Sequence, residues 1–165
     1  MGKLTILIGL PRCGKSTWAR KHSSTNNAIV LSGDDFRLAI TGQRFCLNSE
    51  LHVRANLITA AKALLVNNNV IVDETNTTYY NQRQLLDLTP NPEIVLWHTP
   101  KELCIERAKD CNQYDLIPSI ERMNDNLRIM REGLLSGSWD ERINKDTTTE
   151  IGPILYHIFT EDPYR

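Results

Sequence analysis

Short apolar runs alternate with longer polar or amphipathic stretches along almost the whole chain. Five runs have the length and β-branched content of strands: residues 4–8, 28–32, 70–74, 93–98 and 154–159. Helices are predicted between them over about residues 15–24, 48–68, 101–110 and 118–135, with another ending near residue 88. Such alternation predicts an α/β fold, a three-layer doubly wound parallel sheet whose ligands bind at the carboxyl ends of the strands.

Two segments need a separate interpretation. In the stretch 48–68, five residues repeat at three- and four-residue spacing and predict a core-facing stripe: Leu51, Ala55, Ile58, Ala61 and Leu65. Residues 137–138 and the polar run 144–150 are predicted to be a loose connection, after which residues 154–159 join the sheet as a last strand. We therefore expect one domain over residues 1–165, with a core over 1–135 and a C-terminal extension over 136–165.

Composition and charge narrow the class of protein. At 165 residues, with 41% hydrophobic and 24% charged residues, the chain fits a single globular domain. The net charge is −1, so no global basic field attracts nucleic acid, and a nucleic-acid substrate would need a local basic patch. The four cysteines form no C-x-x-C pair, and no apolar run approaches membrane-spanning length. We expect a cytoplasmic protein without membrane contact, either a monomer or a small homo-oligomer.

The sequence directly after the first strand predicts a phosphate-binding loop. Residues 9–17 read G-x-x-x-x-G-K-S-T between a buried strand and a helix, which is the context that this motif requires. The glycines let successive N–H groups turn towards one anion, and the helix N-terminus adds its positive dipole. Lys15 is predicted to reach the β- and γ-phosphates of ATP and Ser16 to ligate Mg²⁺. The predicted nucleotide-binding residues are Gly9, Pro11, Arg12, Cys13, Gly14, Lys15, Ser16 and Thr17.

Other motifs distinguish among classes of P-loop protein. The N-K-x-D motif with which GTPases read guanine is missing. A helicase or AAA-type motor is usually longer and carries further arginine and sensor motifs. The chain instead has acidic residues at the ends of two predicted strands, Asp34 and Asp73–Glu74, and basic residues before a late loop. This layout is typical of a small kinase, in which a carboxylate addresses the acceptor hydroxyl and arginines hold phosphates.

The motifs resemble those of the 5′-hydroxyl polynucleotide kinase domain of phage polynucleotide kinase and its wider P-loop kinase family. The matching segments are G-x-P-x-x-G-K-S-T-W-A-R over residues 9–20, D-D-x-R over 34–37 and E-T-N over 74–76. The resemblance extends over about three-quarters of the chain, from Leu4 to about Leu127, and implies a nucleotide-kinase-like P-loop NTPase fold.

The resemblance also implies roles for single residues. Asp34, nineteen residues after Lys15, matches the general base, and Arg37 matches the arginine that holds the acceptor's own phosphate. Asp73 or Glu74 would orient the water ligands of Mg²⁺. Glu74 stands where the family has aspartate, and the choice between these two residues stays open at this point.

The acceptor site and the lid are less well defined by sequence. Thr75 and Asn76 either form a turn or line the acceptor site. Arg44 and Phe45, with Arg54 soon after, suit a basic and aromatic contact to a nucleic acid, although Phe45 equally suits packing into the core. Arg107 matches a lid arginine. The second lid arginine of the family is missing, and Lys109 or Arg122 would replace it only in part.

The leading hypothesis is an ATP- and Mg²⁺-dependent kinase that phosphorylates a hydroxyl of a nucleic acid. The 5′-hydroxyl of a DNA or RNA end is the default acceptor, and a hydroxymethylated base in phage DNA is a variant that nothing in the residues selects. For a phage-encoded protein the location would be the host cytoplasm. A small-molecule kinase acting on a nucleoside, sugar or other metabolite is the first alternative, and a non-catalytic nucleotide-binding module is the second.

Overall fold

A five-stranded parallel sheet forms the centre of the molecule. The structure is a computed structural model, and it describes residues 1–160. The strands are β1 (Leu4–Ile8), β2 (Ala28–Ser32), β3 (Asn69–Asp73), β4 (Glu93–Trp97) and β5 (Leu155–Phe159), in the spatial order β2-β3-β1-β4-β5. All four strand pairs are parallel. The predicted doubly wound α/β fold is confirmed.

The three inner strands, β3, β1 and β4, are almost entirely apolar and buried. Every residue of β1 and β4 is buried, as are four of the five residues of β3. Continuous apolar runs of this kind are typical of parallel strands that are covered on both faces. β5 joins the sheet as predicted, in register with β4, and its more polar sequence fits its place at the edge.

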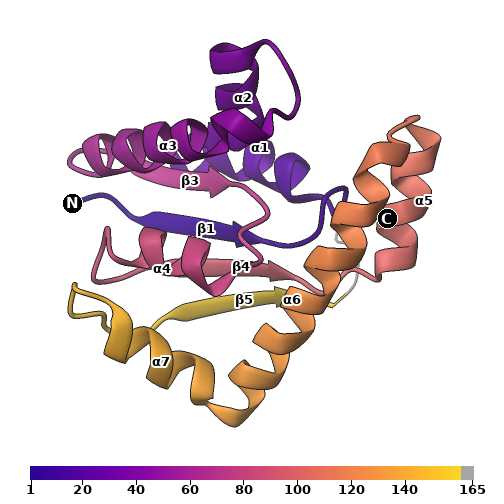
Figure 1. Cartoon of the computed structure of the whole chain (residues 1–165). Coiled ribbons are helices and arrows are strands. Elements are labelled where there is room, and N and C mark those ends of the chain that lie inside the picture. The colour runs from indigo at the N-terminus through magenta and orange to yellow at the C-terminus, as the bar shows by residue number, and fades with distance from the viewer. Residues whose placement is uncertain (161–165) are drawn as a thin grey trace.

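Helices connect the strands and lie on both sides of the sheet (Figure 1). The α-helices are α1 (Lys15–Asn26), α2 (Gly33–Thr41), α3 (Glu50–Leu64), α4 (Tyr79–Leu86), α5 (Lys101–Asp110), α6 (Ile117–Ser136) and α7 (Ser138–Asp146). Short 3₁₀ turns, η1 (Leu47–Ser49) and η2 (Tyr114–Leu116), precede α3 and α6. In Figure 1 the strand arrows all point towards α5 and α6, so these helices stand at the carboxyl edge of the sheet.

Two sequence-based expectations were wrong. The predicted stripe of α3 is wrong in its first half, where Leu51 is 85% exposed and Ala55 is also exposed, because the buried face there starts at Val53 and Leu57. Its second half is right: Ala61 and Leu65 are buried and Ile58 packs against the core.

The second error concerns the predicted loose connection over residues 137–138 and 144–150: residues 138 and 144–146 belong to the helix α7. Trp139 and Ile143, four residues apart on this helix, are 7% and 0% exposed and join the core.

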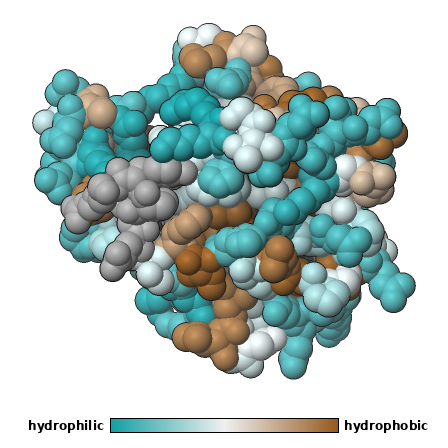
Figure 2. Space-filling model, turned by 180° about the vertical axis from the view of Figure 1, so that it is seen from behind, coloured by the Kyte–Doolittle hydropathy of each residue, from teal (hydrophilic) through white to brown (hydrophobic). Residues whose placement is uncertain are grey.

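The described residues of the C-terminal extension pack against the rest of the chain. α7 packs against α6, and the Tyr156 hydroxyl of β5 donates a hydrogen bond to Asp140 of α7 at 2.6 Å. The last residues of this extension, 161–165, lie outside the described part of the chain. Seen from behind, the surface is largely hydrophilic, with apolar residues gathered near the middle (Figure 2). Among residues 1–160, no helix has the length and hydropathy needed to cross a membrane.

Candidate active site

The loop between β1 and α1 has the backbone geometry of a phosphate-binding loop. Gly14 has φ 105° and Arg12 has φ 66°, both in the left-handed region, where an L side chain such as that of Arg12 is unusual. At Gly9, an added Cβ would lie 2.7 Å from the Cys13 Sγ atom, so the loop has no room for a side chain there. The local sequence thus dictates a turn that only this glycine pattern can form.

Lys15 lies inside this loop. Its side chain is buried, and Nζ donates hydrogen bonds to the carbonyl oxygens of Gly9 at 3.0 Å and Leu10 at 2.7 Å. These bonds satisfy the buried ammonium group and keep a positive charge beside the N-terminus of α1. The predicted phosphate-binding lysine is therefore held at the loop that would receive the anion.

Asp73, at the end of β3, is the carboxylate that faces the phosphate-binding loop. Burial raises the pKa of Asp73, although a hydrogen bond from Ser16 and the positive charge of Lys15 oppose this shift. A hydroxyl and a carboxylate side by side are suitable oxygen ligands for Mg²⁺, which keeps several waters and takes few protein ligands. Among residues 1–160, no group of three or more His, Cys, Asp or Glu residues could hold a metal ion by itself.

Glu74 points to a different part of the site. Its side chain is 14% exposed and its Oε1 accepts a hydrogen bond from Arg37 Nη2 at 3.0 Å. Burial raises the pKa of Glu74, with the charge of Arg37 opposing that shift. The sequence did not distinguish the roles of these two adjacent carboxylates. In the structure, Asp73 faces the phosphate-binding loop and Glu74 faces α2.

The turn from β2 into α2 places Asp34 at the carboxyl edge of the sheet. The Ser32 hydroxyl caps α2 by accepting a hydrogen bond from the Asp35 N–H at 3.4 Å. Gly33 is required, since a Cβ there would lie 1.5 Å from Oε1 of Glu74. The Asp34 side chain is 75% exposed and so is accessible to an acceptor.

Arg37 is the most heavily bonded charged residue of this region. Its guanidinium group donates to Asp34 at 2.9 Å, to Glu74 at 3.0 Å and twice to Glu50, at 2.8 and 2.9 Å. Burial disfavours the charge of Arg37, but these carboxylates outweigh that effect and raise its pKa. Glu50, the first residue of α3, is a site residue that sequence analysis missed.

Thr75 and Asn76 connect β3 to the loop after β1. The Thr75 carbonyl accepts a hydrogen bond from the Gly9 N–H at 3.1 Å. Asn76, with φ 44°, is 1% exposed and donates through Nδ2 to the Leu7 carbonyl at 3.0 Å. The backbone of both residues therefore shapes the site, and the Asn76 side chain is enclosed rather than open to an acceptor.

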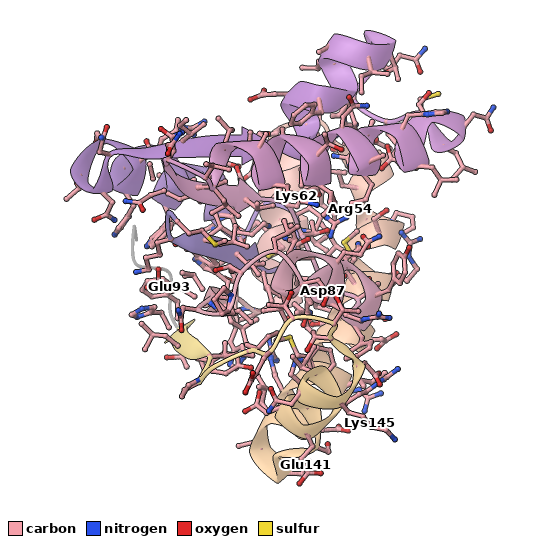
Figure 3. All side chains as sticks on the ribbon, turned by 90° about the vertical axis from the view of Figure 1, so that its left-hand side faces the viewer. Arg54, Lys62, Asp87, Glu93, Glu141 and Lys145 are labelled. Carbon is pink, nitrogen blue, oxygen red and sulfur yellow. The ribbon has the colours of Figure 1, made fainter. Side chains whose placement is uncertain are left out.

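Arg54 also supports this turn. It donates to Oδ1 of Asn76 at 3.1 Å and to Oε1 of Gln84 at 2.9 Å. Burial lowers the pKa of Arg54. Figure 3 shows Arg54 below α3, on the side of this helix that faces the rest of the domain. Because its donors are bonded within the domain, Arg54 in this arrangement fixes the turn and is not available as an exposed phosphate contact.

The helices at the carboxyl edge bring further residues to the site. Arg107 on α5 donates through Nη1 to the Arg12 carbonyl at 3.1 Å, so this predicted lid arginine touches the phosphate-binding loop. Arg44, in the segment after α2, forms an ion pair with Asp115 of η2 and so connects this segment to the start of α6. Lys109 and Arg122 are both exposed.

Phe45 is 61% exposed, so this residue does not pack into the core. The residue lies directly after Arg44, at the exposed segment between α2 and α3. Of the two interpretations that sequence left open, the structure excludes the core position and shows an aromatic ring exposed on the surface.

Comparisons with known proteins identify the family. The family described as "AAA domain" matches residues 4–119. The chain belongs to this family, and its fold is that of a P-loop kinase. The match covers a single P-loop domain and does not identify the chain as an AAA-type motor. A comparison with curated proteins gave no match.

Solved structures give the same fold with more detail. "Structure of the Pnkp1/Rnl/Hen1 RNA repair complex" aligns with TM-score 0.70 and 28% identity, over 79% of this chain and 45% of the other. "Structure of Pnkp1/Rnl/Hen1 complex" aligns with TM-score 0.58 and 30% identity, over 64% and 38%. This chain thus spans less than half the length of both matched chains.

More distant kinases share the fold. The Mycobacterium tuberculosis APS kinase CysC, in complex with AMPPNP and APS, aligns with TM-score 0.56 at 20% identity, over 65% of this chain and 68% of the other. A gluconokinase from Sinorhizobium meliloti 1021 aligns with TM-score 0.53 at 16% identity, over 74% of each chain. At these identities the likeness extends to the fold alone.

Proposed function

We propose that this protein is an ATP- and Mg²⁺-dependent kinase that transfers the γ-phosphate to a hydroxyl of a nucleic acid, by default the 5′-hydroxyl of a DNA or RNA end. The observation that carries the proposal is the accessible Asp34, paired with Arg37 at the same sheet edge as Lys15 and Asp73. Ser32 of β2 lies beside Asp73 of β3 in the sheet, so Asp34, two residues after Ser32, is at the same edge as Asp73. The similarity to the Pnkp1-containing complexes favours the nucleic-acid acceptor.

On the nucleotide side, the loop N–H groups and Lys15 would bind the β- and γ-phosphates of ATP. To do so, Lys15 would exchange its bonds with the carbonyls of Gly9 and Leu10 for bonds with phosphate oxygens. Ser16 and Asp73 would hold Mg²⁺, which neutralises charge on the transferring phosphate. Arg107, already in contact with the loop, would add positive charge from the lid.

On the acceptor side, Asp34 would accept the proton of the attacking hydroxyl. The hydroxyl oxygen forms a bond to the γ-phosphorus, the bond from this phosphorus to the β–γ bridging oxygen breaks, and ADP leaves. Glu74 would position Arg37 through their ion pair and would not act as the base. Exposed Phe45 and Arg44 are suitable contacts for a base and a backbone phosphate of the acceptor.

A small-molecule acceptor is the second candidate, and one observation favours it. Arg37, which would hold the acceptor's phosphate in a polynucleotide kinase, is already bonded to three carboxylates. A neutral nucleoside or sugar would not need to displace any of them.

The test is transfer of labelled γ-phosphate from ATP with Mg²⁺ to a panel of acceptors. The panel contains 5′-hydroxyl DNA and RNA oligonucleotides, hydroxymethylated duplex DNA, nucleosides and sugars, and the Asp34→Asn variant is the control for contaminating kinases. We expect label on oligonucleotides, mapped to the 5′ end and absent with the variant. Label on nucleosides or sugars alone would overturn the nucleic-acid acceptor and leave a small-molecule kinase.

A further inference from the structure

The guanidinium group of Arg37 has its hydrogen-bonding capacity nearly filled. Arginine has five N–H groups, and four of those of Arg37 are bonded to carboxylates. Glu50 accepts from Nε at 2.8 Å and from Nη2 at 2.9 Å, while Nη2 also donates to Glu74 and Nη1 to Asp34. An anion can therefore obtain a two-pronged contact with Arg37 only by displacing a carboxylate.

Glu50 is the carboxylate that an incoming anion would replace. It binds Arg37 through both oxygens, which is the geometry that a phosphate uses with arginine. Glu74 is fixed on the sheet and its side chain is only 14% exposed, and Asp34 holds just one nitrogen. Glu50 is 27% exposed, more than Glu74, and begins α3 directly after the segment 42–49.

The local charge adds to this competition. Three carboxylates surround one guanidinium group, so the cluster has a net charge of −2 when all are ionised, and the nearby Arg54 offsets part of it. A second anion therefore approaches a region that is already negative. Removing the charge of Glu50 would release one N–H group on Nε and one on Nη2 of Arg37, and it would also reduce this repulsion.

We propose that Glu50 is a specificity-determining residue: it occupies the face of Arg37 that the phosphate of a nucleic-acid end would use, so that such an acceptor binds by displacing Glu50 and gains less affinity from its phosphate than it would without this carboxylate. The inference rests on the proposed function for its setting, since it assigns the acceptor to the Asp34–Arg37 side. A carboxylate exchanged for a phosphate on one arginine changes the number of charge-assisted hydrogen bonds little, so the acceptor gains little from Arg37 while Glu50 is present.

The experiment measures binding by calorimetry, with a non-hydrolysable ATP analogue and Mg²⁺ already bound. The two probes are thymidine and thymidine 3′-phosphate, and the proteins are the wild type, Glu50→Gln, and Glu50→Gln combined with Arg37→Gln. Glu132→Gln is the matched control, since Glu132 pairs with Arg128 on the exposed side of α6, at 3.0 Å. Thermal unfolding confirms that each variant is folded, and Glu50→Ala, which also removes the carboxylate, replaces Glu50→Gln if that variant does not fold.

We expect Glu50→Gln to bind thymidine 3′-phosphate about tenfold more tightly than the wild type, which is the scale of one additional charge-assisted hydrogen bond. Thymidine binding should not change, the double variant should lose this increase in affinity, and Glu132→Gln should behave as the wild type. Unchanged or weaker binding of the phosphorylated probe would overturn the proposal, as would an equal increase in affinity for both probes. Transfer of label to the 5′-hydroxyl oligonucleotides of the acceptor panel is recorded in parallel: its absence in the wild type would refute the proposed function, while the binding ratio still decides the role of Glu50.

Discussion

Asp34 and Arg37 lie one helical turn apart on α2, and their ion pair has 2.9 Å between Asp34 Oδ1 and Arg37 Nη1. The two side chains differ in exposure, 75% for Asp34 and 15% for Arg37. The partly buried guanidinium group thus holds the carboxylate through one oxygen, while the Asp34 side chain stays largely exposed. A base that must receive a proton at a fixed point benefits from such support.

The first prediction concerns this carboxylate. Asp34→Asn should lower the rate of phosphate transfer by about two or more orders of magnitude, because an amide cannot take the hydroxyl proton. Binding of ATP, measured by calorimetry, should stay within about twofold of the wild type, since Asp34 lies on the acceptor side. Asp35→Asn is the matched control and should keep its activity. Full activity of Asp34→Asn would shift the role of base to Asp35 or to the substrate.

The second prediction concerns the phosphate-binding loop. Lys15→Ala should abolish transfer, because it removes the charge that the loop encloses with the carbonyls of Gly9 and Leu10. Lys62→Ala, on α3, is the control and should leave the rate unchanged (Figure 3). Steady-state kinetics with the best acceptor of the panel is the measurement. Full turnover by Lys15→Ala would exclude a phosphate-binding role of this loop.

The parts of the fold that sequence predicted correctly are those fixed by local rules. The apolar runs marked the strands, and the glycine-framed loop follows from backbone freedom at Gly9 and Gly14. Pro100 and Pro118 marked two helix starts within one or two residues. The sequence therefore predicted the loop between β1 and α1 and the placement of Asp34 just after a strand end.

What sequence missed depends on tertiary contacts. The polar helix α7 carries only two core residues, Trp139 and Ile143, too few to mark a helix before their packing partners are known. The Arg37–Glu50 pair joins two helices across a segment whose path no local pattern specifies. Asp73 and Glu74 were indistinguishable because adjacent residues on a strand differ only in the face to which they point.

A third prediction follows from the burial of Asp73. Burial raises the pKa of Asp73, so its ionised form opposes folding: the contribution of this group is most favourable at low pH and is lost as the pH rises through the raised pKa. Asp73→Asn should therefore unfold at a higher temperature than the wild type at pH 7, and this difference should shrink towards pH 4.

The same variant should lose Mg²⁺-dependent transfer, because it lacks one of the two proposed Mg²⁺ ligands. Thermal unfolding at the two pH values and transfer assays over a series of Mg²⁺ concentrations are the measurements. Asp125→Asn, on the exposed side of α6, is the control for the general effect of losing one negative charge. A lower melting temperature for Asp73→Asn at pH 7 would show that the bond with Ser16 outweighs the cost of burial.

The last prediction tests whether the C-terminal extension belongs to the cooperative unit. Trp139 is 7% exposed, and its ring meets that of Tyr79 edge-on at a centroid distance of 5.3 Å. Trp139→Ala should lower the free energy of unfolding by about 3–5 kcal/mol, the usual cost of removing a buried tryptophan side chain. Lys145→Ala, on the exposed side of α7, should change it by less than about 0.5 kcal/mol. Urea unfolding followed by circular dichroism measures both. If Trp139→Ala leaves the main transition unchanged and adds a separate early one, α7 and β5 unfold independently of the P-loop core.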